Sequence, residues 1–184
     1  MSGVTTHKTV PPLILVVGGF WFLGTLLAGV SPARGFELTP KPSPTVGVHV
    51  TAFIDHAPLQ PAEHFRLNVV VSLDEGWHIY SLESQGDISL PTRVDVDARG
   101  VVPISDWQES PPTIMNDQIL QRMVKVHLDR AEFRRDFAVE PDLGPGHYLI
   151  RGTLQFRACD NRICTLPRKL EFTTRMRIVT GDRV

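Results

Sequence analysis

The chain has 184 residues, of which 42% are hydrophobic, and its formal net charge is -1. This length suits one domain with a targeting segment. The near-neutral charge and the lack of a basic patch exclude binding of nucleic acid that is driven by charge.

Residues 13–30 form an uncharged apolar run of 18 residues. A signal-peptide core has about 7–15 apolar residues and a membrane-spanning helix has about 20. Small residues that suit cleavage follow at Ala33 and Gly35. We therefore predict that residues 1–35 are a signal peptide or an uncleaved membrane anchor. The chain would contact a membrane only through residues 13–30. The rest of the chain would then lie outside the cytoplasm, where disulfides persist.

Residues 36–45 contain three prolines and show no periodicity, which is typical of a linker. From residue 46 onward, apolar and polar residues alternate with a period of two. This period predicts strands. We expect them at 46–54, 65–73, 77–82, 91–98, 101–104, 123–128, 148–158 and 170–178. Pro103 would confine the strand at 101–104 to a sheet edge.

Two segments depart from this pattern. Residues 105–118 contain Pro111, Pro112 and several polar residues, so we expect a long loop. Residues 131–139 are ambiguous, because Phe133 and Phe137 are spaced four apart, as on one face of a helix. A short helix and an edge strand both fit this segment.

About eight short strands, each with one apolar face, predict an all-β domain at 46–184 with an immunoglobulin-like β-sandwich architecture. Helices do not alternate with strands, which excludes a thioredoxin fold. The disulfide that joins the two sheets of immunoglobulin domains is also excluded, because Cys159 and Cys164, the two cysteines of the chain, lie too close in sequence.

The cysteine pair has three interpretations. As a structural bridge, it would close a loop of about six residues and stabilise by only roughly 2 kcal/mol, against about 4.7 kcal/mol for a loop of 100. As a closed zinc site it lacks a second cysteine pair, although a copper site with Met115, Met123 and His78 is conceivable. As a reversible dithiol, it has the two neighbouring sulfurs that thiol–disulfide exchange needs.

Alternation along the strand before the pair predicts which cysteine is accessible. Leu154, Phe156 and Ala158 share the apolar face, so Cys159 falls on the polar one. We therefore expect an exposed Cys159 sulfur that attacks, or is attacked, first.

Two segments resemble a known family. The string ACDNRICTLP at 158–167 follows a run that ends in LQF, and EGWHIYSL at 75–82 precedes Gly86-Asp87 and Leu90-Pro91-Thr92. In this order they resemble the N-terminal periplasmic domain of the thiol:disulfide interchange protein DsbD, over roughly residues 45–180. The resemblance implies an immunoglobulin-like fold and a redox-active pair, Cys159 and Cys164, that works without a cofactor or a bound metal.

The resemblance also implies partners. A thioredoxin-like or membrane-bound redox protein would donate electrons, and oxidised periplasmic proteins would accept them. The full transporter continues into a membrane domain and a thioredoxin-like domain that this sequence lacks, so we expect a protein-disulfide reductase component that needs a separate electron donor. The alternative is a periplasmic binding module, for a redox complex or for copper, with a purely structural disulfide.

Three further residues are candidates for a supporting role. In the family resembled, an aromatic residue on a loop covers the disulfide, and Trp107 is the candidate here, with Ile114 or Met115 as substitutes. His78 and Tyr80 lie two apart on one strand face, and the family has aromatic residues near the cysteines at this point. A plainer interpretation stays open for each: Trp107 packs on the edge of the sandwich, and His78 is a surface residue beside a half-buried Tyr80.

Overall fold

The computed structural model describes residues 46–84 and 90–180, in which all regular secondary structure is β-strand. The prediction of an all-β, immunoglobulin-like sandwich is confirmed. The predicted signal or anchor at 1–35 and the linker at 36–45 lie outside the described residues. Within the described ranges, no helix has the length and apolar character needed to cross a membrane.

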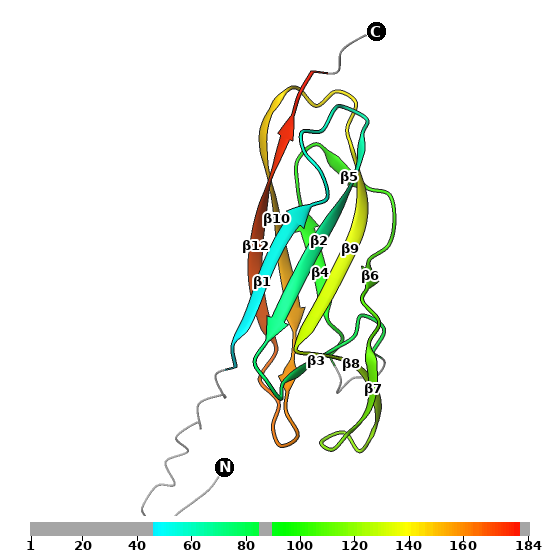
Figure 1. Cartoon of the computed structure of the whole chain (residues 1–184), viewed down its shortest axis with the longest axis vertical. Coiled ribbons are helices and arrows are strands. Elements are labelled where there is room, and N and C mark those ends of the chain that lie inside the picture. Colours follow the sequence, from blue (N-terminus) through cyan, green and yellow to red (C-terminus); the bar gives the residue numbers. More distant parts are fainter. Residues whose placement is uncertain (1–45, 85–89, 181–184) are drawn as a thin grey trace, which may run out of the picture. The chain divides into compact units, whose positions relative to one another are not determined.

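Two antiparallel sheets face each other and form the sandwich (Figure 1). The first has the order β1-β2-β9-β5, with β6 also paired to β9; its strands are β1 (Val48–Ile54), β2 (His64–Leu73), β9 (Arg130–Val139), β5 (Val101–Pro103) and β6 (Gln108–Glu109). The second has the order β12-β10-β4, and its strands are β12 (Arg168–Ile178), β10 (Gly146–Phe156) and β4 (Arg93–Asp97).

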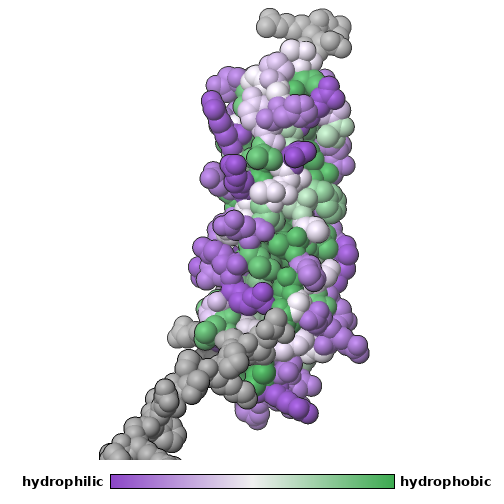
Figure 2. Space-filling view, turned by 90° about the vertical axis from the view of Figure 1, so that its left-hand side faces the viewer, coloured by the Kyte–Doolittle hydropathy of each residue, from purple (hydrophilic) through white to green (hydrophobic). Residues whose placement is uncertain are grey.

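The core fills the space between these sheets because alternate residues of each strand point inward. Its largest fully buried side chains include Leu67, Phe133, Leu154 and Phe156. Figure 2 shows the side of the domain on which β1 and β12 lie, where apolar residues are visible between hydrophilic ones. This exposure is expected at the edges of two facing sheets, where core side chains are only partly covered.

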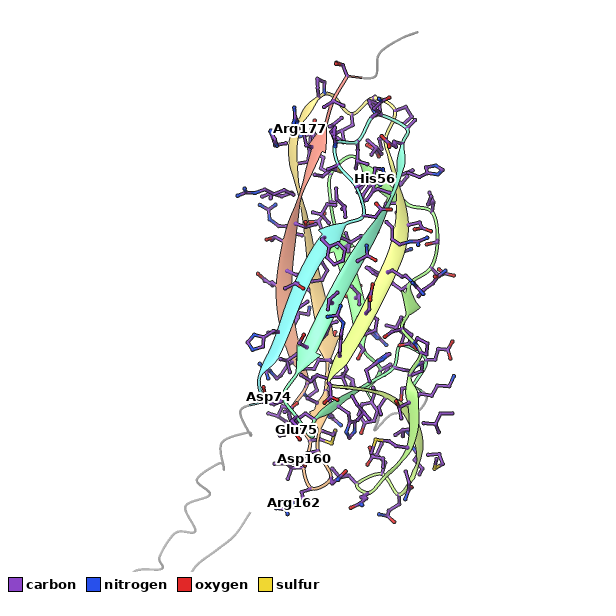
Figure 3. All side chains as sticks on the ribbon, viewed as in Figure 1. His56, Asp74, Glu75, Asp160, Arg162 and Arg177 are labelled. Carbon is purple, nitrogen blue, oxygen red and sulfur yellow. A yellow bond between two sulfur atoms is a disulfide. The ribbon has the colours of Figure 1, made fainter. Side chains whose placement is uncertain are left out.

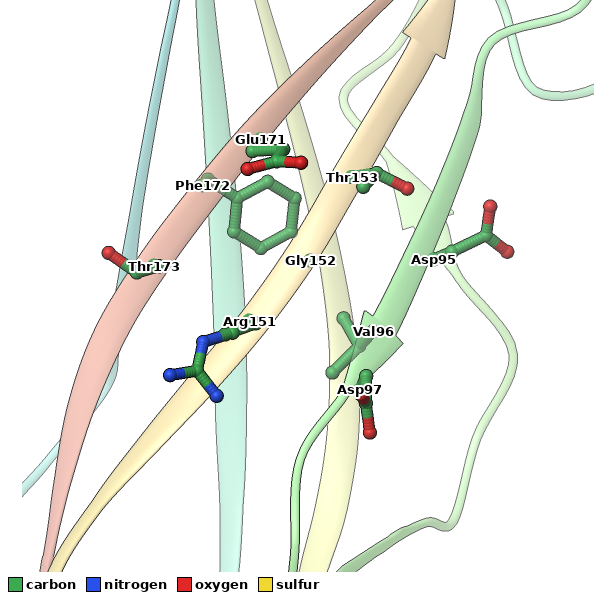
Figure 4. Close-up of a pocket in the computed structure, with 9 residues that line it drawn as sticks. All are labelled: Asp95, Val96, Asp97, Arg151, Gly152, Thr153, Glu171, Phe172 and Thr173. Atoms are coloured by element: carbon green, nitrogen blue, oxygen red, sulfur yellow. The ribbon is translucent and has the colours of Figure 1, made fainter.

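Gly152 makes room for a core ring at the centre of the second sheet. It pairs with Phe172 of β12 and with Val96 of β4. A Cβ atom at Gly152 would lie 2.7 Å from the carbonyl oxygen of Asp95 and closer still to the ring of Phe172. Figure 4 shows this ring beside Gly152. The missing side chain is therefore required for this packing.

The ambiguous segment is β9, an inner strand rather than a short helix or an edge strand, because it pairs with β2 on one side and with β5 and β6 on the other. Its inward row contains Arg135 between Phe133 and Phe137, and this arginine hid the period of two. The guanidinium group lies 5.9 Å from the ring centre of Trp107 and 5.8 Å from that of Phe137, and its Nε donates to the carbonyl oxygen of Ser105 at 2.7 Å.

A smaller sheet lies at one end of the sandwich and carries the cysteines (Figure 1). It has the order β11-β3-β8-β7, with strands β11 (Ala158–Cys159), β3 (His78–Tyr80), β8 (Arg122–Leu128) and β7 (Thr113–Asp117). The predicted loop at 105–118 was thus wrong in part, since it contains β6 and β7. The antiparallel pairing of β7 with β8 stabilises a strand that the polar residues and prolines of the segment concealed.

Two strands of the small sheet continue strands of the sandwich. Arg157 alone separates β10 from β11, and Asp129 alone separates β8 from β9. Asp129 has a φ of 58°, and its carbonyl oxygen accepts a hydrogen bond from the Leu73 N–H at 2.8 Å. These single-residue connections fix the small sheet against the sandwich.

Candidate active site

Cys159 and Cys164 form a disulfide across a tight turn. Their backbones pair as an antiparallel bridge, the Asp160 N–H donates to the Ile163 carbonyl oxygen at 3.0 Å, and the Thr165 N–H donates to the Ala158 carbonyl oxygen at 2.8 Å. The Asp160 carboxylate also accepts the N–H groups of Arg162 and Ile163, each at 2.7 Å. Backbone hydrogen bonds on both sides of the disulfide therefore close this turn.

Asp160 remains a carboxylate in this turn. Burial alone would raise its pKa, but the hydrogen bonds from the Ile163 and Arg162 N–H groups outweigh that effect, so the pKa is lowered. Figure 3 shows Asp160 and Arg162 at the end of the domain that carries the small sheet.

Cys159 is buried, which corrects the expectation of an exposed sulfur. The residue is 0% exposed, whereas Cys164 is only partly buried. The alternation of β10 ends at Phe156, and the chain changes sheets at Arg157. Beyond that point both sides of the strand are covered: Ala158 belongs to the main core, and Cys159 belongs to a small cluster with Tyr80, Val124 and Val126. We call this small cluster, which Met115, Leu120 and Cys164 border, the sulfur cluster.

A buried tyrosine and a buried carboxylate lie against the Cys159 sulfur. The Tyr80 hydroxyl donates to Asp117 Oδ2 at 2.7 Å and lies 3.4 Å from Cys159 Sγ. Burial raises the pKa of Tyr80, and the neighbouring Asp117 raises it further. The phenol is therefore a neutral donor at physiological pH.

Asp117 connects this site to the turn between β7 and β8. Its Oδ1 accepts the N–H groups of Ile119 and Leu120 at 2.8 and 2.9 Å. Burial would raise the pKa of Asp117, but the hydrogen bonds from the Tyr80 hydroxyl and the two N–H groups lower it overall. A single charged side chain thus orients Tyr80 and holds the turn that places Leu120 on the sulfur cluster.

His78 lies directly opposite Cys159 in the ladder between β3 and β11. It is 3% exposed, its ring meets that of Tyr80 edge-on at 5.7 Å, and its Nε2 lies 4.0 Å from Asp117 Oδ2. Within the described part of the chain, this Nε2 has no hydrogen-bond partner. Burial lowers the pKa of His78, although the nearby Asp117 and Asp160 act in the opposite direction.

The structure brings His78 and Tyr80 to the cysteines but places Trp107 elsewhere. Trp107 packs against the main core and under the guanidinium group of Arg135. The hairpin of β7 and β8 packs against the sulfur cluster instead, through Met115 and Leu120. Met115 is one of the two predicted substitutes for Trp107; the other, Ile114, is 64% exposed.

Sequence reasoning missed Asp117 and Leu120. The alternation in TIMND at 113–117, followed after a polar turn by the strand at 123–128, is a hairpin signal that would have found them.

Glu109 has a different partner, His127, which lies beside Ile79 in the ladder between β3 and β8. Its Oε2 contacts His127 Nε2 at 2.9 Å and accepts the Leu82 N–H at 2.8 Å. Burial would raise the pKa of Glu109, but these hydrogen bonds, His127 first, lower it overall. This second pair, in which His127 is buried and Glu109 is partly buried, links β6 to the small sheet.

In the part of the chain that the structure describes, no group of three or more His, Cys, Asp or Glu residues is placed to hold a metal ion. A pocket of about 360 Å³ is lined by residues of β4, β10 and β12 that include Asp97, Arg151 and Phe172 (Figure 4). None of the residues around the disulfide lines it.

Comparison with known proteins finds one family model that matches this chain. Residues 49–175 match the family model described as thiol:disulfide interchange protein DsbD, N-terminal. A comparison with curated protein sequences finds no match.

Two N-terminal domains are among the solved structures that match this chain. The reduced N-terminal domain of DsbD from Neisseria meningitidis is 17% identical, with a TM-score of 0.41, over 59% of this chain and 74% of that one. The N-terminal periplasmic domain of ScsB from Proteus mirabilis is 15% identical, with a TM-score of 0.45, over 68% of this chain and 45% of that one.

Proposed function

The chain belongs to the family of the N-terminal domain of the thiol:disulfide interchange protein DsbD, and from this premise we propose that it relays electrons between redox proteins through Cys159 and Cys164. The domain would work in the periplasm, either secreted or tethered to the inner membrane by residues 13–30. A thioredoxin-like or membrane-bound dithiol protein donates electrons, and oxidised periplasmic proteins accept them. Trp107 has no role in this proposal; Tyr80 and the β7–β8 hairpin support the site.

One observation carries the proposal: the disulfide closes a turn that is already closed without it. The backbone hydrogen bonds of the turn and the carboxylate of Asp160 hold the same residues together. A loop of about six residues gains only roughly 2 kcal/mol from cross-linking. The bond is therefore a weak brace, and reversible opening accounts better for its place beside a buried hydroxyl donor.

The exposures of the two cysteines suggest their roles. A thiolate of the donor attacks Cys164 Sγ, the more accessible sulfur, and forms a mixed disulfide. The electron pair of the broken bond passes to Cys159 Sγ, which leaves as a thiolate beside the Tyr80 hydroxyl. The second thiolate of the donor then attacks the donor's sulfur in the mixed disulfide and releases Cys164 as a thiolate. The donor is thereby oxidised to a disulfide, and this domain is reduced by two electrons.

Exposed apolar side chains at this end of the domain suit a protein partner. The β7–β8 hairpin and the segment from Ile163 to Leu166 carry five of them: Ile114 (64% exposed), Ile119 (39%), Met123 (64%), Ile163 (45%) and Leu166 (69%). A contiguous apolar patch commonly marks an interaction surface, and we propose that these side chains form one. A thioredoxin-like donor would bury them while its cysteine reaches Cys164.

Trapping of mixed disulfides tests the roles of the two cysteines. In cells, Cys159→Ser leaves the accessible Cys164 thiol without its resolving partner, so it should accumulate mixed disulfides with other exported proteins. Cys164→Ser leaves only the buried thiol and should trap at least tenfold less. The double variant is the control for adventitious capture. Stronger trapping by Cys164→Ser than by Cys159→Ser would reverse the assignment, equal trapping would contradict it, and no trapping by either would refute the relay.

The reduction potential separates this function from the alternative of a binding module with a structural disulfide. Structural disulfides usually have potentials below about -300 mV, whereas exchange sites lie well above that value. Equilibration of the full-length chain with defined glutathione ratios should place this disulfide above about -300 mV. Binding of Cu(I) by the reduced chain, lost in the double variant, would favour the copper alternative.

A further inference from the structure

Opening the disulfide creates a charge in a buried place. If the proposed exchange occurs, Cys159 leaves as a thiolate while it is enclosed by Tyr80, Val124 and Val126. A buried anion without a compensating positive charge or hydrogen bonds is strongly unfavourable. The Tyr80 hydroxyl can contribute only by weakening its existing bond to Asp117.

The buried imidazole opposite Cys159 can supply a positive charge. His78 faces Cys159 across the ladder, and directly opposed residues of antiparallel strands have Cβ atoms about 4.5–5.5 Å apart. Its Nε2 lacks a hydrogen-bond partner in the described ranges while lying 4.0 Å from Asp117 Oδ2. A protonated ring would have carboxylate and thiolate neighbours, whereas a neutral ring leaves Nε2 unused.

We infer that His78 binds a proton when the Cys159–Cys164 bond opens and releases it when the bond re-forms. This inference rests on the proposed opening of the disulfide. The donor dithiol supplies two electrons and loses two protons to solvent during the exchange. His78 takes up one proton from solvent beside the Cys159 thiolate, and the more exposed Cys164 thiolate equilibrates with solvent on its own.

The charges around His78 set the direction of this coupling. The groups that face it or its neighbours are Asp117 on β7, Tyr80 on β3, Cys159 on β11, Asp160 in the cysteine turn, Arg157 between β10 and β11, and Arg122 on β8. Among these, the side chain that changes charge with redox state at neutral pH is Cys159. An opposite charge within about 4–6 Å raises proton affinity by roughly tenfold or more, so reduction favours the imidazolium.

His127 is a matched internal control. It is as buried as His78, at 3% exposed, and belongs to the adjacent strand β8 of the same sheet. Its ring meets Phe133 of the main core, and its Nε2 already contacts Glu109 at 2.9 Å. A general change of the fold on reduction would affect both histidines, whereas a charge at Cys159 affects His78.

Histidine-labelled NMR of the full-length chain tests the inference. Titrations from pH 4 to 9 would be recorded for the disulfide form and for the form reduced with excess dithiothreitol. The proton affinity of His78 should rise at least tenfold on reduction, while that of His127 changes less than twofold. The inference is overturned if His78 titrates identically in both forms, or if the two histidines shift together.

A second measurement depends on the coupling rather than on the signal of one ring. The equilibrium constant for reduction of the disulfide by glutathione should depend on pH. Reduction of the wild type should take up one more proton than reduction of His78→Phe, a variant that retains an aromatic ring against Tyr80. Identical pH dependence in the two proteins contradicts the inference. If His78→Phe does not fold, the wild-type titration decides alone.

The reductant in both measurements is a small thiol, so they do not require a protein partner. Failure of trapping with normal redox coupling would reject the electron relay alone. Trapping without coupling at His78 would reject this inference alone.

Discussion

Removal of the Asp117 carboxylate should destabilise the domain by about 3 kcal/mol, although the residue lies outside the main core. Asp117→Ala leaves the Tyr80 hydroxyl without its acceptor, and this hydroxyl is almost completely buried. It also frees the N–H groups of Ile119 and Leu120. Hydrogen bonds to a charged group contribute about 1.5–3 kcal/mol each, and a buried unsatisfied group costs about 1–3 kcal/mol. The sum is reduced because water reaches the freed N–H groups and the burial of a charge is relieved.

Urea and thermal denaturation followed by circular dichroism measure this loss. For a domain of this size, about 3 kcal/mol corresponds to a fall in Tm of roughly 10 °C. Asp117→Asn retains an acceptor oxygen for the turn and should lose about half as much. Asp136→Ala is the matched control: this aspartate accepts two hydrogen bonds from Arg66, at 2.7 and 3.2 Å, but its side chain is 33% exposed. Exposed pairs contribute about 0–1 kcal/mol.

The pH dependence provides a further check on Asp117. Its folded pKa is lowered, so its contribution to the free energy of unfolding is present above the unfolded value, about 3.9, and is lost as pH falls further. The difference between wild type and Asp117→Asn should therefore shrink below about pH 4. If Asp117→Ala and Asp136→Ala differ by less than about 0.5 kcal/mol at pH 7, Asp117 does not hold the site together as argued.

Three more outcomes follow from particular contacts. Gly152→Ala should lower the free energy of unfolding by about 1–3 kcal/mol, because the new Cβ overlaps the Phe172 ring, whereas Gly144→Ala, with open space around it, should change little in the same denaturation assay. Glu109→Gln should lose about 1–2 kcal/mol at pH 7 and should flatten the fall in stability below about pH 4.5, because the pKa of Glu109 is lowered in the folded state. Leu120→Ala should speed reduction of the disulfide by dithiothreitol severalfold, since it uncovers the sulfur cluster; an unchanged rate would show that the side chain is no barrier.

Most of the fold could be predicted because the strands of the sandwich each bury one face. The prediction of secondary structure failed where a charged residue lies in the inward-facing row of a strand. Arg135 lies in the inward row of β9, yet its guanidinium group is satisfied by a backbone oxygen and two rings. Its charge made the segment look like one face of a helix, and only the pairing of β9 with its neighbours resolves the ambiguity.

The proximity of the candidate residues was predictable from the sequence, but their burial was not. The spacing of the cysteines and the strand at 77–82 led to Cys159, Cys164, His78 and Tyr80. Alternation then failed at Cys159, because a rule that holds within one sheet ends where the chain passes into another. Asp117 was missed because its role depends on Tyr80, which is 37 residues away in sequence, and a single sequence does not reveal contacts of that kind.

The junction between sheets also determines how the disulfide becomes accessible. β11 and β8 are fixed because each continues a long strand of the sandwich, whereas β7 pairs, among the described strands, with β8 alone. Elements with few partners open at lower free energy than the strands of the core. The segment that packs against the sulfur cluster can therefore open by local separation of β7 and its turn, while β10 stays paired with β12 and β4, and β11 with β3. Amide hydrogen exchange should then be at least tenfold faster in residues 113–121 than in the inner strand β10, and equal protection of both would mean that access requires a larger unfolding.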